Sequence, residues 1–150
     1  MTDPLSSTRR AGVLAVLRAP SAAVASDAVD ALGRGGITGI EVTYSTPDAA
    51  TVIADARSRH GDAVLVGAGT VTTVAQAAEA AEAGAAFLVS PGTVPELAAA
   101  MLATGRVTMT GALTPSEVMT ALRVGVHVVK IFPASRGGPA YRGALRGPFP

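Results

Sequence analysis

The sequence predicts an α/β fold in which parallel strands alternate with helices, and three observations support this class. Short apolar segments rich in β-branched residues alternate with alanine-rich segments of helical periodicity. The predicted strands begin about every 20 to 27 residues, enough for one strand, one helix and two connections. Prolines and glycines stand at the boundaries of the predicted helices. Because parallel neighbours need crossover connections, this alternation indicates a parallel sheet.

Composition narrows the class of protein further. The chain has 150 residues, 49% of them hydrophobic, which predicts a single domain over residues 1–150. The 12 basic residues nearly balance the 11 acidic ones and aromatic residues make up 3%, so neither nucleic acid nor a membrane surface is expected as a partner. The absence of cysteine excludes disulfides and thiolate sites. Residues 1–10 lack the apolar stretch of a signal peptide, and we expect a cytoplasmic protein.

Each element follows from a local signal. Runs of β-branched and apolar residues predict the strands, which are Val13–Leu17, Ile37–Thr43, Ala63–Val66, Ala86–Val89, Arg106–Met109 and His127–Phe132. Amphipathic segments with N-capping residues, first-turn prolines and following glycines predict the helices between them. These helices are Ser21–Arg34, Pro47–His60, Thr73–Ala83, Pro95–Thr104 and Pro115–Val124. A loop at Ser135–Pro139 and a short helix at Ala140–Arg146 come last.

Polar side chains gather where the predicted strands end, among them Arg18, Glu41, Ser90 and Lys130. Central strands of an open doubly wound sheet are apolar on both faces. In a (β/α)8 barrel, by contrast, polar groups from several strands converge at the C-terminal ends and form the active site. We therefore predict a barrel of the TIM type, represented here by about six βα units.

Lys130 is the only lysine of the chain, and it lies in the apolar run His127–Pro133. Removal from water disfavours the ammonium form of a lysine and makes the free amine available as a nucleophile. The alternative is a strand-end lysine whose amine reaches water or an ion pair. The position alone leaves both interpretations open.

Glu41 and Arg18 each allow two interpretations. Glu41 lies within a β-type run, where a carboxylate near a neutral amine could move protons during Schiff-base chemistry. It could equally form an ordinary ion pair with Arg18 or Lys130. Arg18 is the only charge of the first strand, and its guanidinium suits a carboxylate or phosphate. A surface arginine at a strand end is the alternative.

The remaining motifs argue against nucleotide binding and against a metal site. Gly67-Ala68-Gly69-Thr70 lacks the third glycine of a dinucleotide-binding turn, because Thr72 stands in its place, so we interpret it as a tight strand-to-helix turn near a ligand. Ser90-Pro91-Gly92 ends a strand in a similar way. His60 and His127 are far apart and lack a carboxylate at ligand spacing, so no metal site is expected.

Taken together, ordered blocks over nearly the whole chain resemble the 2-keto-3-deoxy-6-phosphogluconate aldolase family, class I aldolases that also act on 4-hydroxy-2-oxoglutarate. The blocks are Ala15–Ala19, Gly36–Thr43, Thr46–Ala49, Val66–Val71, Leu88–Gly92, Leu113–Glu117 and Val129–Ala134. The resemblance implies that Lys130 forms a Schiff base with a 2-keto acid and that Glu41 is the general acid and base. It also implies that Arg18 binds an anion and that a metal and a cofactor are not required. Around the pyruvyl group it places Thr70, Pro91 and Phe132.

The resemblance further implies cleavage to pyruvate and an aldehyde, glyceraldehyde 3-phosphate or glyoxylate, by a homotrimer. Two local departures stand out. Some relatives have an arginine where this chain has Ser45, and others have Pro-Gly where it has Thr110-Gly111. The chain also ends at Pro150, where a seventh strand is expected to begin.

From this ending we expect a barrel truncated by roughly two βα units, with open edges at its first and sixth strands. We also expect weakened turnover, especially of phosphorylated substrate. A non-catalytic remnant or binding module of the same fold is the alternative function, and a doubly wound nucleotide-binding domain is the third.

Overall fold

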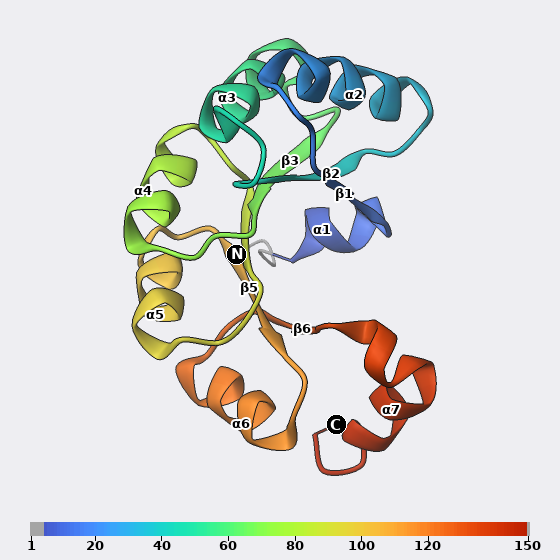
Figure 1. Cartoon of the computed structure of the whole chain (residues 1–150), viewed down its shortest axis with the longest axis vertical. Coiled ribbons are helices and arrows are strands. Elements are labelled where there is room, and N and C mark those ends of the chain that lie inside the picture. The colour runs from blue at the N-terminus through green and yellow to red at the C-terminus, as the bar shows by residue number, and fades with distance from the viewer. Residues whose placement is uncertain (1–4, 150) are drawn as a thin grey trace.

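The computed structural model describes residues 5–149, which form a curled sheet of six parallel strands with helices along its outer side (Figure 1). The strand order β1-β2-β3-β4-β5-β6 follows the sequence, so each crossover joins neighbouring strands. This arrangement confirms the predicted barrel with about six βα units. The predictions for Met1–Pro4 and for the chain end at Pro150 lie outside the described residues.

The helices and strands have the following bounds. The strands are β1 (Leu14–Leu17), β2 (Gly39–Thr43), β3 (Leu65–Gly69), β4 (Phe87–Ser90), β5 (Val107–Ala112) and β6 (Val128–Ile131). The helices are α1 (Ser6–Ala11), α2 (Ala22–Arg34), α3 (Ala49–His60), α4 (Val74–Glu82), α5 (Pro95–Ala103), α6 (Pro115–Val124) and α7 (Gly138–Leu145), with a 3-10 turn η1 (Ala134–Arg136). None of the described helices is long and apolar enough to cross a membrane.

The two faces of the sheet have separate cores. On the outer face, strand residues such as Ile40, Val66 and Leu88 pack with buried residues of the helices that follow them. On the inner face, Phe87, Val89, Val107 and Met109 form a second cluster. Because side chains alternate between the faces of a strand, inner residues fill the barrel and outer residues bind the helices.

Strand β3 lies further along the chain than predicted. The sequence predicts that this strand ends at Val66 and that the glycines after it form a turn. In the structure the strand continues through Gly69. A Cβ at Gly67 would lie 2.4 Å from the Phe87 ring, and a Cβ at Gly69 would lie 2.0 Å from Glu41 Oε1. These glycines therefore make room for inner side chains inside a strand, and the chain turns only at Thr70, which has a φ of 53°.

Two further differences concern the helices. Helix α1 was not predicted, because its sequence Ser-Ser-Thr-Arg-Arg-Ala has no apolar periodicity. It lies on the concave side of the sheet, where the preceding Leu5 packs against the inner cluster (Figure 1). Pro47 precedes α3 instead of lying in its first turn, because the helix begins at Ala49. Pro95 and Pro115 do begin their helices, as predicted.

Candidate active site

Lys130 and Glu41 meet at the C-terminal end of the barrel. The Nζ of Lys130 lies 3.8 Å from Oε1 of Glu41. Their strands, β6 and β2, are separated in the sheet by β3, β4 and β5. Only the curl of the sheet can bring two side chains this close across three intervening strands. An amine and a carboxylate at this distance can exchange a proton directly or through one water.

Glu41 is deeply buried, with 4% of its side chain exposed. Gly69 on β3 provides the space for its carboxylate, because any larger residue there would overlap Oε1. Burial raises the pKa of Glu41, while the positive charges of Lys130 and Arg18 favour the carboxylate and oppose that rise. A carboxyl group with a raised pKa can hold a proton and release it again nearer to neutral pH, as general acid and base catalysis requires.

Lys130 is less enclosed than Glu41, with 30% of its side chain exposed. Its Nζ lies 5.3 Å from the centroid of the Phe132 ring, which is two residues further along the same chain segment. An aromatic face at this distance attracts the ammonium form and also forms an apolar wall beside the amine. The amine is therefore partly accessible from outside the site.

Two buried threonines hold the backbone on both sides of Arg18. The hydroxyl of Thr43 donates to the carbonyl oxygen of Leu17 at 3.0 Å. The amide of Ala19 donates to the hydroxyl oxygen of Thr46 at 3.2 Å. Arg18 therefore has a fixed backbone position beside the end of β2, where its charge acts on Glu41. Ser45 lies 2.7 Å from the Thr43 hydroxyl and extends this polar group of residues.

Thr70 and Pro91 follow the neighbouring strands at the same end of the barrel. Thr70 adopts a left-handed backbone conformation, which is costly for a residue with a side chain and is concentrated at functional sites. Pro91 directly follows β4, and its carbonyl group packs against Gly111. Gly111 in turn pairs with Lys130 in the sheet. The strand ends thus place Thr70 and Pro91 at the same rim as Lys130.

The two histidines serve the structure. His60 Nε2 lies 2.7 Å from Asp30 Oδ1 and links α3 to α2 on the outside of the barrel. The amide of Thr108 donates to Nδ1 of His127 at 3.0 Å. Within residues 5–149, no group of three histidine, aspartate or glutamate side chains could hold a metal ion.

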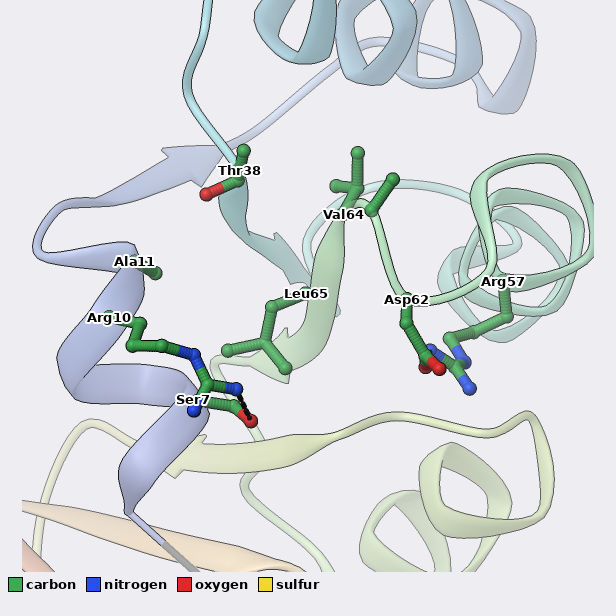
Figure 2. A pocket seen from close by; sticks show the side chains of 9 residues that line it. Ser7, Arg10, Ala11, Thr38, Arg57, Asp62, Val64 and Leu65 are labelled. Carbon is green, nitrogen blue, oxygen red and sulfur yellow. Dashed lines mark hydrogen bonds and ion pairs between the residues drawn. The ribbon is translucent and has the colours of Figure 1, made fainter.

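A pocket of about 410 Å³ lies at the opposite end of the barrel (Figure 2). It is bounded by α1 and by the residues that precede β2 and β3. Its charged side chains already bond to neighbouring groups: Arg10 donates to the Ser7 hydroxyl at 2.9 Å, and Arg57 donates to the Gly61 carbonyl oxygen at 2.9 Å. Since barrel chemistry is located at the C-terminal ends of the strands, this pocket lies away from the candidate site.

The charged residues at the strand ends could be predicted from the sequence, but the groups that position them could not. Thr46, Thr93 and Thr110 form side-chain bonds between segments that are distant in sequence. Threonine is common in strands and at helix starts, so its sequence position alone gives no sign of such a bond. The close approach at Gly111 has no sequence signal either, since glycine also marks ordinary turns.

Comparison with known proteins gives a consistent family. The family model for KDPG and KHG aldolase matches residues 5–150. The 2-dehydro-3-deoxy-phosphogluconate aldolase of Treponema pallidum is 47% identical over 120 residues, covering 79% of this chain and 57% of the relative. The enzyme of the same name from Pseudomonas aeruginosa is 38% identical over 143 residues, covering 95% of this chain and 64% of the relative. The chain therefore spans less than two thirds of either relative.

A solved structure also shares the fold. The KDPG aldolase of Legionella pneumophila, with pyruvate captured as a covalent carbinolamine intermediate, superposes with a TM-score of 0.90 at 34% identity. The match covers 99% of this chain and 72% of the Legionella chain. The similarity in sequence and the similarity in backbone structure thus indicate the same group of proteins.

Proposed function

Because the chain belongs to the KDPG and KHG aldolase family, we propose that it catalyses Schiff-base aldol cleavage of a 2-keto acid. The proposed substrates are 2-keto-3-deoxy-6-phosphogluconate, which yields pyruvate and glyceraldehyde 3-phosphate, and 4-hydroxy-2-oxoglutarate, which yields pyruvate and glyoxylate. The observation that carries this proposal is the 3.8 Å approach of Lys130 Nζ to Glu41 Oε1 at the C-terminal end of the barrel.

In the proposed reaction, Lys130 Nζ adds to the C2 ketone of the substrate and forms a carbinolamine. Loss of water then gives an iminium ion, which withdraws electrons from the neighbouring bonds. Removal of the C4 hydroxyl proton breaks the C3–C4 bond, and the aldehyde leaves. The electron pair moves to C3 and produces the enamine of pyruvate. Protonation at C3 and addition of water release pyruvate and restore the amine.

Glu41 is the group that moves protons in this scheme. It takes and returns the protons of the carbinolamine and of the C4 hydroxyl, for which its position beside Lys130 is suitable. The raised pKa of its buried carboxyl group supports this role, because burial makes the protonated form easier to reach than for a carboxyl group in water. Arg18 binds the substrate carboxylate from the neighbouring strand end, and the pyruvyl group lies among Thr70, Pro91 and Phe132.

Reductive trapping tests the proposal. The chain is incubated with pyruvate, reduced with borohydride, digested with trypsin and mapped by mass spectrometry. Lys130 is the only lysine, and the flanking cleavage sites are Arg123 and Arg136. We expect alkylated Lys130 to resist trypsin, so that peptide 124–136 stays intact and carries the reduced pyruvyl group.

The matched control is Lys130→Arg, which keeps the positive charge but cannot form a Schiff base at this position. Trypsin cuts the variant after this arginine, so we expect peptides 124–130 and 131–136, neither of them carrying an adduct. An adduct on the N-terminal amine alone, or equal labelling of wild type and control, would contradict the proposed function and favour a binding module of the same fold.

The proposed assembly is a homotrimer located in the cytoplasm, as the resemblance to the family implies. Sedimentation equilibrium of the purified chain measures its mass in solution. A mass three times that of the chain is the expected outcome, and a monomer would contradict it.

A further inference from the structure

The turn after β4 is held to the neighbouring strand by side chains instead of backbone. The last backbone pair between β4 and β5 joins Ser90 to Thr110. Pro91 comes next and has no N–H with which to continue the pairing. The Ser90 hydroxyl closes the turn on itself by donating to the Gly92 carbonyl oxygen at 2.7 Å. This bond shapes the turn but does not attach it to β5.

Thr93 supplies that attachment. Its hydroxyl donates to the carbonyl oxygen of Gly111 at 2.9 Å and is hydrogen bonded to the hydroxyl of Thr110 at 2.7 Å. Thr110 is completely buried, so this bond is shielded from competing water. The two threonines lie 17 residues apart in the chain. Together they join the turn to β5 at the level of Gly111.

Gly111 connects this attachment to the candidate site. A Cβ at this position would lie 1.9 Å from the carbonyl oxygen of Pro91, so the turn rests directly on the bare backbone. On its other side, Gly111 pairs with Lys130. The position of the turn therefore determines where Pro91 lies relative to the strand that carries the proposed nucleophile.

Resting on the proposed aldolase function, we propose that Thr93 and Thr110 are positioning residues that hold Pro91 against β5 and thereby shape the pyruvyl site. In this chain a hydroxyl pair performs the attachment. Removing it leaves Pro91 and Lys130 in place chemically but loosens the geometry in which they receive the keto acid.

The variants Thr110→Val and Thr93→Val each remove one hydroxyl with little change in shape. We expect each to raise the pyruvate concentration that half-saturates borohydride-trapped adduct at Lys130 by about 3- to 10-fold, the equivalent of one net hydrogen bond. Thr93→Val removes the bond to the Gly111 carbonyl oxygen as well as the bond to Thr110, so the double variant should bind pyruvate no more weakly than Thr93→Val alone. Thr110→Ser should restore the wild-type value.

Thr108→Val is the matched control. Thr108 is also completely buried on the same face of β5, and its hydroxyl donates to the Arg106 carbonyl oxygen at 3.2 Å. We expect it to lower the melting temperature without changing half-saturation. Faster hydrogen exchange of amides 92–94 in Thr93→Val and Thr110→Val, but not in Thr108→Val, would show directly that the turn is released.

The pyruvate concentration for half-saturation could rise no more in Thr110→Val than in Thr108→Val. That result would overturn the positioning role and leave Thr110 a purely structural residue. Unchanged exchange at amides 92–94 would overturn the attachment itself. If the wild-type chain formed no adduct at Lys130, the proposed function would fail, and so would the role of the pair in shaping a pyruvyl site. The exchange measurement would still decide whether the two threonines hold the turn.

Discussion

Strands β2 and β6 each carry one of the two central residues of the candidate site, but they lie in different environments. Every residue of β2 is buried, and Glu41 is 4% exposed. Every residue of β6 is partly exposed, and Lys130 is 30% exposed. The difference follows from position in the sheet, because β2 lies between β1 and β3 whereas β6 is an edge strand of the described residues. The enclosed carboxyl group has a raised pKa, which suits the proton transfer proposed for it, whereas the amine of Lys130 is partly exposed, which suits the proposed Schiff base.

The largest expected effect is on catalysis by Glu41. Glu41→Gln should lower kcat for aldol cleavage by roughly 10²- to 10⁴-fold, the usual contribution of a general acid and base. The accessible amine of Lys130 should still form a borohydride-trapped adduct with pyruvate. Glu79→Gln is a suitable control, since that carboxylate bonds to the Tyr44 hydroxyl at 2.9 Å. Equal kcat in Glu41→Gln and Glu79→Gln would remove the proposed distinction between β2 and β6.

A smaller effect should come from displacing the Glu41 carboxylate without removing it. In Gly69→Ala, the added Cβ would lie 2.0 Å from Glu41 Oε1 and force the carboxylate away from Lys130. We expect kcat to fall by about 10²-fold, as for a misplacement of about 1 Å. Gly143→Ala is the control, because nothing lies within 4 Å of a Cβ there. Steady-state kinetics and circular dichroism of both variants would separate loss of geometry from loss of fold.

The burial of β2 should also affect stability through Thr46. Thr46→Val removes the acceptor of the Ala19 amide and leaves a buried N–H without a partner. Urea denaturation should show a loss of about 1–3 kcal/mol in the free energy of unfolding.

In the helix that leads to β6, Thr114→Ala removes the N-cap of α6 and should lower the free energy of unfolding by about 1 kcal/mol. A larger loss in the free energy of unfolding for Thr114→Ala than for Thr46→Val would contradict this prediction.

The smallest expected effect is on the pH dependence of stability. The pKa of Glu41 is raised above 4.5 in the folded protein, so the folded state binds a proton more strongly than the unfolded state. Its contribution to stability therefore falls as pH rises from 4.5 through the raised pKa. Glu41→Gln should remove this decline, and Glu79→Gln should keep it. Urea denaturation of the wild type, Glu41→Gln and Glu79→Gln at a series of pH values from 4.5 upward measures how the free energy of unfolding changes in each.

Much of the fold could be predicted from local pattern. Apolar runs and helix boundary residues placed all six strands and the five helices between them, because each signal lies within the element that it describes. Strict alternation also places Glu41 and Lys130 on the inner faces of their strands. The resemblance to a known family added roles for these residues that the patterns alone left open.

Predictions from local sequence pattern were wrong where a residue contacts a segment that is distant in the sequence. Gly67 and Gly69 were interpreted as a turn, because glycine signals a turn in a local reading. They lie in β3 since Phe87 and Glu41 need the space above them. Helix α1 was missed for a related reason, because the Leu5 that precedes it packs against strands far along the chain.

The sequence by itself determined the order of the βα units and the presence of a lone lysine and a glutamate at strand ends. Only the tertiary structure decided that these two residues meet, because a distance of 3.8 Å across β3, β4 and β5 depends on the curl of the whole sheet. It also decided which threonines bind which backbone groups, as at Thr46 and Thr93. Such bonds join segments 27 and 18 residues apart, and no local periodicity records them.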